Sequence, residues 1–150
     1  MRQQIPIGLT KVLKNYKKTI WTNLQHLILS KVDEELDDDE IYEIFLEIAP
    51  FLPPSLLIIE LLIQEISPEF FQRFLDKLKA SIVCLVLGCT EVNDSHLSIC
   101  SKYSKKKKSL KKVFYVWNGI FSKEWINVKN DRNNCLEYIG PYNNVAFKYF

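Results

Sequence analysis

The sequence predicts an α+β protein, with an N-terminal helical bundle or short helical array of about four helices followed by a small antiparallel β meander. Two observations favour this fold class. Leu and Ile recur at three- and four-residue steps up to about residue 90, whereas short aromatic and β-branched runs separated by turn residues begin at residue 112. We therefore expect a helical domain at 1–90, a polar, lysine-rich linker at 91–111 and a small β appendage at 112–150.

The first two predicted helices have apolar residues on one side. The segment 8–31 carries Leu, Val, Ile and Tyr at helical steps with lysines opposite, and Pro6 and Gly8 precede it. The segment 36–48 begins with a run of acids that favour the positive end of a helix dipole, and Asp37 or Asp38 can cap it. Pro50 then ends this second helix.

The next two predicted helices are more apolar. The segment 53–66, "PPSLLIIELLIQEI", is apolar almost all round, so we expect it to be the most buried helix. Ser67 followed by Pro68 is a helix start signal, since a hydroxyl can cap the helix and proline is favoured at its first position. This fourth helix is expected to continue toward Leu87 and to stop at Gly88. A search for repeats of about 40 residues finds nothing convincing.

The remaining segments differ in composition from the helices. Residues 89–111 hold Thr, Asn, Asp, Ser and Lys with few large apolar residues, which is typical of a linker. Beyond residue 112, "KVFYVWN", "EWINVKN", "CLEYIG" and "VAFKYF" alternate with polar turn residues. Three or four short strands in an antiparallel meander fit this pattern, and so small a unit must pack against the helices or against a partner.

Charge is distributed unevenly along the chain, although the net charge is only +2. Residues 33–47 hold nine acids and no base, and residues 102–112 hold seven lysines and no acid. The lysine run is consistent with a solvated hinge, with a nuclear address, or with a contact to DNA or RNA, because closely spaced ammonium groups bind phosphates. The candidate nucleic-acid-binding residues are Lys102, Lys105, Lys106, Lys107, Lys108, Lys111 and Lys112.

Nothing in the sequence predicts catalysis. The chain has no glycine-rich phosphate loop, nucleophile elbow or dinucleotide fingerprint, and its only histidines are His26 and His96. Cys89, His96, Cys100 and Cys135 are residue types that zinc accepts, but they lack a Cys-x2-Cys knuckle. We therefore expect no enzyme activity, no cofactor and no metal.

The apolar residues predict a protein partner. The sequence holds more large apolar side chains than a four-helix core and a thin meander can bury, and exposed apolar patches mark interaction sites. We expect a non-catalytic protein-interaction module, as a subunit of an intracellular multiprotein assembly, which binds another chain or itself. The candidate partner-binding residues are Phe70, Phe71, Phe147 and Phe150.

Two alternative functions remain. The lysine run at 102–112 would suit a nucleic-acid-binding protein, such as a subunit of a replication or chromatin complex. The scarcity of arginine beside abundant lysine is typical of A/T-rich genomes, which allows a viral or parasite effector that binds a host protein. The N-terminus lacks the apolar segment of a signal peptide, so we expect the nucleus or cytoplasm rather than secretion, and no segment is predicted to span a membrane.

Overall fold

Strands and helices alternate along the chain in the computed structural model, which describes residues 2–6, 23–31, 37–88, 92–115 and 136–141. The strands are β1 (Arg2–Pro6), β2 (His26–Ser30), β3 (Ile58–Leu62), β4 (Cys84–Leu87), β5 (Lys112–Tyr115) and β6 (Tyr138–Pro141). The helices are α2 (Asp38–Ile48), the short 3-10 helix η2 (Ala49–Phe51), α3 (Pro68–Lys77) and α4 (Asp94–Lys107).

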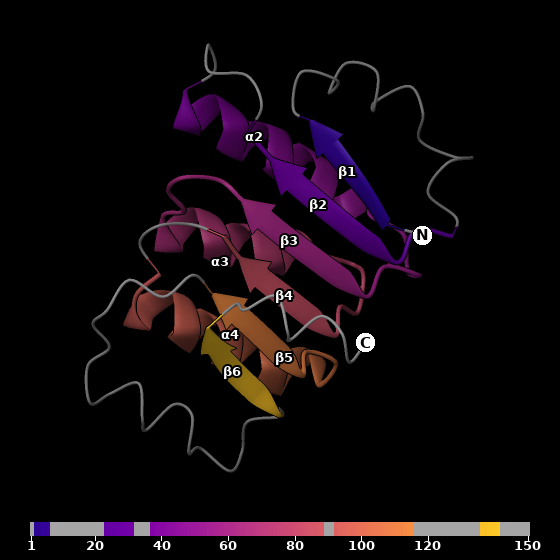
Figure 1. Cartoon of the computed structure of the whole chain (residues 1–150), viewed down its shortest axis with the longest axis vertical. Helices are drawn as coiled ribbons and strands as arrows, with labels where there is room; N and C mark the ends of the chain where they lie inside the picture. The colour runs from indigo at the N-terminus through magenta and orange to yellow at the C-terminus, as the bar shows by residue number, and fades with distance from the viewer. Residues whose placement is uncertain (1, 7–22, 32–36, 89–91, 116–135, 142–150) are drawn as a thin grey trace.

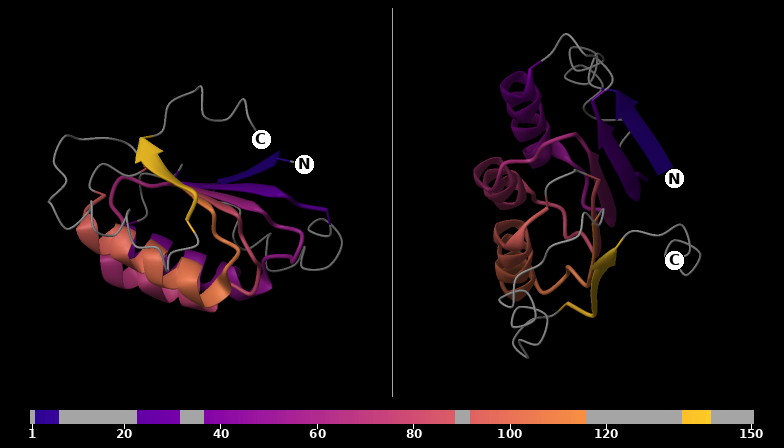
Figure 2. Two further views of the ribbon diagram at one scale, coloured as in Figure 1. Left: turned by 90° about the horizontal axis from the view of Figure 1, so that it is seen from below. Right: turned by 60° about the vertical axis from the view of Figure 1, so that its left-hand side comes forward.

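The strands form one parallel sheet in the order β1-β2-β3-β4-β5-β6, so each strand lies beside the next one in the sequence. The helices α2, α3 and α4 form a single layer on one face of this sheet (Figures 1 and 2). The fold is therefore α/β, and the predicted helical bundle and antiparallel meander are wrong. Strands from the predicted helical domain and from the predicted β appendage pair within this one sheet.

A short apolar pattern repeats at every strand from β2 to β6. Each strand is preceded by a Leu or Ile, and two further apolar or ring-bearing residues follow three and five positions later. The first position is occupied by Leu24, Leu56, Ile82, Leu110 and Leu136, so the repeat is 26 to 32 residues long. The second is occupied by Leu27, Ile59, Leu85, Val113 and Ile139, which are register partners across the sheet.

Equivalent positions of successive repeats therefore stack to form the core. All residues at the first two positions belong to, or pack against, the main hydrophobic cluster, together with the apolar faces of the helices. The residue that follows each first position makes the same hydrogen bond in successive repeats. Its backbone N–H donates to a carbonyl of the preceding repeat, as seen at Leu57, Val83, Lys111 and Glu137. A chain whose repeats contact mainly their neighbours in sequence is a solenoid.

Each described α-helix starts at a side-chain cap. Asp37 and Glu40 form a capping box at α2, Ser67 accepts from the N–H of Phe70 at α3, and Asn93 accepts from the N–H of Ser95 at α4. These starts agree with the predicted caps of α2 and α3.

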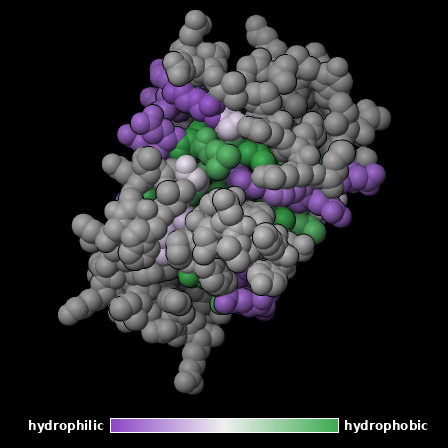
Figure 3. Space-filling model, in the orientation of Figure 1, coloured by the Kyte–Doolittle hydropathy of each residue, from purple (hydrophilic) through white to green (hydrophobic). Residues whose placement is uncertain are grey.

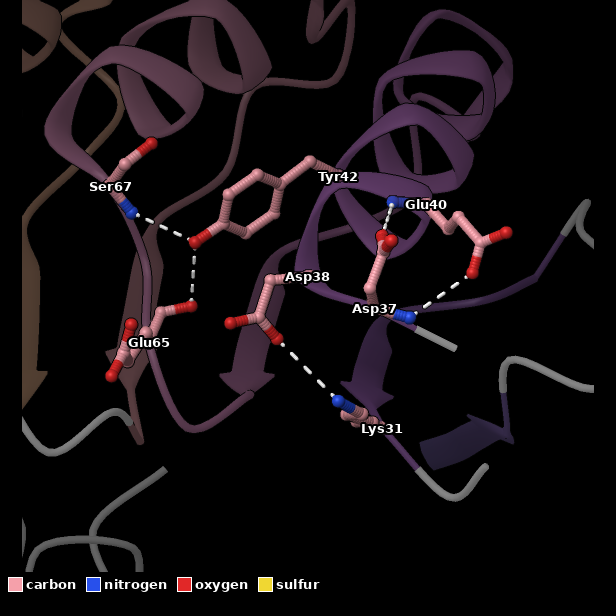
Figure 4. A network of polar contacts seen from close by, with 7 residues as sticks. All are labelled: Lys31, Asp37, Asp38, Glu40, Tyr42, Glu65 and Ser67. Atoms are coloured by element: carbon pink, nitrogen blue, oxygen red, sulfur yellow. Dashed lines mark hydrogen bonds and ion pairs between the residues drawn. The ribbon is translucent and has the colours of Figure 1, made fainter. Parts of the chain in front are cut away.

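Aromatic packing joins α2 to α3. The rings of Tyr42 and Phe70 stack with centroids 4.1 Å apart, and Phe45, Phe70 and Phe74 pack in tilted pairs. The hydroxyl of Tyr42 also donates to the carbonyl of Glu65 and accepts from the N–H of Ser67, which holds α2 against the start of α3 (Figure 4).

Strands replace three stretches that were expected to be helical. Residues 26–30 and 58–62 are strands, and the expected fourth helix ends at Lys77, after which Cys84–Leu87 is β4. Parallel strands buried on both faces are continuous apolar runs, which resemble buried helices in sequence. Residues 8–22 of the expected first helix lie outside the described residues.

His96 connects α4 to the segment that precedes α3. This buried side chain accepts from the N–H of Asn93 at Nδ1 and donates from Nε2 to the carbonyl oxygen of Ile66, 2.5 Å away, as a neutral imidazole does. Burial lowers the pKa of His96, and the hydrogen bond with Ile66 offsets part of that shift.

We expect stability to fall as the pH is lowered. The folded-state pKa of His96 lies below its unfolded value of about 6.5, so the unfolded state binds more protons and gains on the folded state below that pH. The melting temperature should decrease as the pH is lowered from about 7.5 to about 5. In the variant His96→Gln, the melting temperature should change less over the same pH range. An unchanged slope in the variant would show that other groups cause the pH dependence.

Candidate interaction surfaces

The face of the sheet opposite the helices carries a paired histidine and glutamate. His26 on β2 and Glu60 on β3 approach with His26 Nε2 2.5 Å from Glu60 Oε1, and their side chains are only 13% and 4% exposed. Figure 3 shows this face, on which apolar and hydrophilic residues lie side by side. Cys84, Val86 and Phe114 form a small second cluster there, with Ile58 packed against it.

This arrangement does not favour covalent chemistry. Burial raises the pKa of the Cys84 thiol to about 12, with a further increase from Glu60 and a decrease from Lys112. The thiol is therefore protonated at neutral pH, whereas a nucleophilic or metal-binding cysteine must be a thiolate. Because the cluster residues are buried, they also offer a partner little surface.

The residues that zinc could accept do not come together in the described structure. Cys100 is buried, which raises the pKa of its thiol, and His96 uses both ring nitrogens on the backbone of Asn93 and Ile66. Cys89 and Cys135 lie outside the described residues. Within the described ranges no group of three or more His, Cys, Asp or Glu side chains could hold a metal ion.

The lysine run lies on a helix and not in an irregular linker. Lys102, Lys105, Lys106 and Lys107 belong to α4, and Lys108 ends it in the left-handed conformation with φ 59°. Two features stabilise the helix at residues 94–107. Asn93 caps its start, and the positive charges of the lysines in its last turn interact favourably with the negative end of the helix dipole.

The seven lysines do not share one surface. Lys102, Lys105, Lys106 and Lys108 are exposed on or at the end of α4, and Lys106 forms an ion pair of 3.7 Å with Asp76 of α3. Lys111 and Lys112 are half-buried, and Lys112 starts β5 near the Cys84 thiol on the opposite side of the sheet. A single strip of seven ammonium groups is therefore not formed.

The predicted partner-binding phenylalanines fall into two groups. Phe70 and Phe71 are buried in α3, where Phe70 stacks on Tyr42 and Phe71 lies against the ring of His96. These two side chains stabilise the core and are not accessible to a partner in this fold. Phe147 and Phe150 lie outside the described residues.

An exposed apolar surface lies instead on the loop between α2 and β3. In the described part of the chain, the exposed large hydrophobic side chains are Phe51 at 61%, Leu57 at 41% and Leu62 at 38%. Phe51 ends η2 and Leu57 immediately precedes β3, so both belong to residues 49–57, which we call the α2–β3 loop. Leu62 lies at the other end of β3.

Prolines and hydrogen bonds hold the α2–β3 loop in place. Pro50, Pro53 and Pro54 each fix one backbone angle. The N–H of Leu56 donates to Pro53, and the Ser55 hydroxyl donates to the carbonyl of Leu24 at 2.8 Å. The loop is also the longest described helix-to-strand connection, and it contributes to the 32-residue spacing from Leu24 to Leu56.

Phe51 is not among the partner-binding candidates predicted from the sequence, although the sequence carries a signal for it. Its signal was the segment "APFLPP", in which prolines flank a large aromatic residue.

Comparison of the chain with protein-family models, with curated proteins and with solved structures finds no match. Among the described residues, no helix has the length and apolar character needed to cross a membrane.

Proposed function

We propose that the protein is a non-catalytic interaction module that binds another protein through the α2–β3 loop. The observation that carries this proposal is the 61% exposure of Phe51 in a structure whose other described phenylalanines are buried. Burying a phenylalanine side chain fully is worth about 1.5–3 kcal/mol, so the exposed part of Phe51 offers a partner a substantial gain.

The repeat architecture supports the same proposal. The spacing of Leu110, Val113, Tyr115, Asn118 and Ile120 resembles the leucine-rich-repeat pattern L-x-x-L-x-L-x-x-N-x-L. Proteins built from such repeats stack them to present extended binding surfaces, and insertions between repeats map to loops that often form the binding face. The long α2–β3 loop is such an insertion relative to the following repeats. This argument rests on an analogy of architecture.

The fixed conformation of the α2–β3 loop favours binding. A loop that is already ordered loses little conformational freedom when a partner docks, so more of the contact energy appears as affinity. We infer that the partner presents an apolar pocket or groove that accepts Phe51, with Leu57 at its border. A subunit of a larger assembly and a protein that binds a host factor both fit this mode of interaction.

The experiment compares three immobilised proteins in cell extract at about 0.5 M salt, where phosphate contacts are strongly weakened and apolar contacts persist. The test variant is Phe51→Ser/Leu57→Ser, and the matched control is Leu62→Ser, which removes exposed apolar surface at the opposite end of β3. We expect wild type and control to retain a common protein that the test variant loses, with all three melting alike. Equal retention by all three, or no retained protein, would contradict the proposal.

A further inference from the structure

A half-buried tyrosine lies within the acidic segment of the chain. Tyr42 belongs to α2, and residues 37–43 hold five acids and no base. Four of these acids are exposed, namely Asp37, Asp39, Glu40 and Glu43. By contrast, Tyr103 of α4 and Tyr115 of β5 are buried. The surroundings of Tyr42 therefore combine a partly accessible side chain with a dense set of exposed carboxylates.

The hydroxyl of Tyr42 holds α2 against the segment that precedes α3. It donates to the carbonyl of Glu65 at 2.9 Å and accepts from the N–H of Ser67 at 3.1 Å (Figure 4). Burial raises the pKa of Tyr42, the N–H of Ser67 lowers it, and the carboxylates of Asp38 and Glu65 raise it further. Added negative charge on this oxygen is therefore unfavourable while α2 is docked.

We propose that Tyr42 is a phosphorylation site for a tyrosine kinase that selects acidic segments, and that the phosphate releases α2 from α3. In the transfer, Tyr42 Oη attacks the γ-phosphorus of ATP, the bond to the β,γ-bridging oxygen breaks, and ADP leaves. The phenolic proton passes to the carboxylate base of the kinase. A basic substrate groove attracts the exposed carboxylates around Tyr42. The inference does not use Phe51, so it does not depend on the proposed function.

The kinase reaches Tyr42 when α2 opens locally. Helix α2 has 11 residues, and an isolated helix of that length is marginally stable in water. Undocking therefore also unwinds the segment, which can then enter an active site in an extended form. Such local openings cost less free energy than global unfolding.

The phosphate opposes the return of α2 to its docked position. It removes the proton that Tyr42 donates to Glu65, and it adds a charge of about −1.5 to −2 beside the carboxylates of Asp38 and Glu65. The apolar contacts of the buried Ile41 and Phe45 are not altered. We therefore expect α2 to open more often, while the rest of the fold stays intact.

Incubation of the full chain with ATP and a tyrosine kinase that prefers acidic peptides tests the site. Mass spectrometry of the digested chain should locate phosphate on Tyr42. Asp39→Asn/Glu43→Gln removes two exposed carboxylates near Tyr42 and should slow this reaction at least about threefold. The matched control Glu69→Gln/Glu137→Gln removes two exposed carboxylates elsewhere and should leave the rate unchanged.

Hydrogen exchange of the purified phosphoprotein tests the release of α2. Amides of residues 41–48 should exchange at least about tenfold faster than in the unmodified chain, and those of residues 59–61 in β3 should not change. Tyr42→Phe removes both hydrogen bonds without adding charge, so it should increase exchange less than the phosphate does.

Three results would overturn the inference. The first is no phosphate on Tyr42 under conditions that fully phosphorylate an acidic tyrosine peptide. The second is an equal rate for wild type and Asp39→Asn/Glu43→Gln, because the exposed acids would then not be selected. The third is phosphate on Tyr42 with unchanged exchange in α2, because the helix would then stay docked.

Discussion

Phe74→Ala is expected to lower the free energy of unfolding by about 3–5 kcal/mol, the range for truncating a fully buried phenylalanine. Phe74 belongs to α3, and its side chain packs between α3 and α2. Its ring is tilted against those of Phe45 and Phe70, at centroid distances of 6.5 and 5.9 Å. Truncation leaves a cavity in this aromatic cluster, which the surrounding helices can fill only in part.

Chemical denaturation of Phe74→Ala beside Phe51→Ala tests this assignment. Phe51 is 61% exposed, so its truncation should change stability far less, by about 0.5 kcal/mol or less. Similar losses in the two variants would show that the core and the surface have been assigned incorrectly.

Glu60→Ala is expected to cost about 3 kcal/mol, because removing one partner of a buried side-chain hydrogen bond takes that bond away from the other partner, His26 Nε2. Glu60 lies on the face of the sheet opposite α2, α3 and α4, with its Oε1 2.5 Å from His26 Nε2. The matched control is Glu65→Ala, since the side chain of Glu65 is exposed and only its backbone carbonyl binds Tyr42.

A double-mutant cycle measures the interaction energy between His26 and Glu60 separately from the effect of each residue alone. Replacing both residues, as in His26→Leu/Glu60→Leu, should destabilise the protein much less than the sum of the single losses, because apolar residues of similar shape can replace both partners of a buried polar contact at little cost. Additive losses would show that His26 and Glu60 act independently.

Helix starts could be predicted from the sequence because their signals are local. Asp37 and Ser67 cap helices where predicted, and Pro50 lies in η2, two residues beyond the end of α2. The start of α4 carries a similar signal at Asn93, but the lysines that follow suggested a linker. Their repulsion in water is modest, whereas the buried face of α4, including Leu97, Cys100 and Tyr103, stabilises the helix.

The strands were missed because their apolar pattern resembles that of a helix. The step of three residues from Leu24 to Leu27 and from Leu56 to Ile59 is also a helical step, and the residues between are themselves apolar in β3 and β4. The repeat is 26–32 residues long, which is shorter than the repeats of about 40 residues considered from the sequence. It is clear in the register partners of successive strands.

The candidate sites were less predictable than the helix starts. Phe70 and Phe51 are both large and apolar, and only the packing of α3 against α2 shows that one is buried and the other exposed. Lys112 is likewise separated from the lysines of α4 because the strand β5 begins at Lys112, shortly after the helix ends. Exposure is a property of the folded chain, so composition predicted a partner surface without locating it.

The most direct test of one parallel solenoid sheet is nuclear magnetic resonance of the full chain. Residues 58–62 and 84–87 should show the carbon chemical shifts of extended backbone, and cross-strand contacts should join Ile59 to Leu85 and Leu85 to Val113 in parallel register. Helical shifts in these two segments, or antiparallel contacts between β4 and β5, would contradict the fold on which both proposed sites depend.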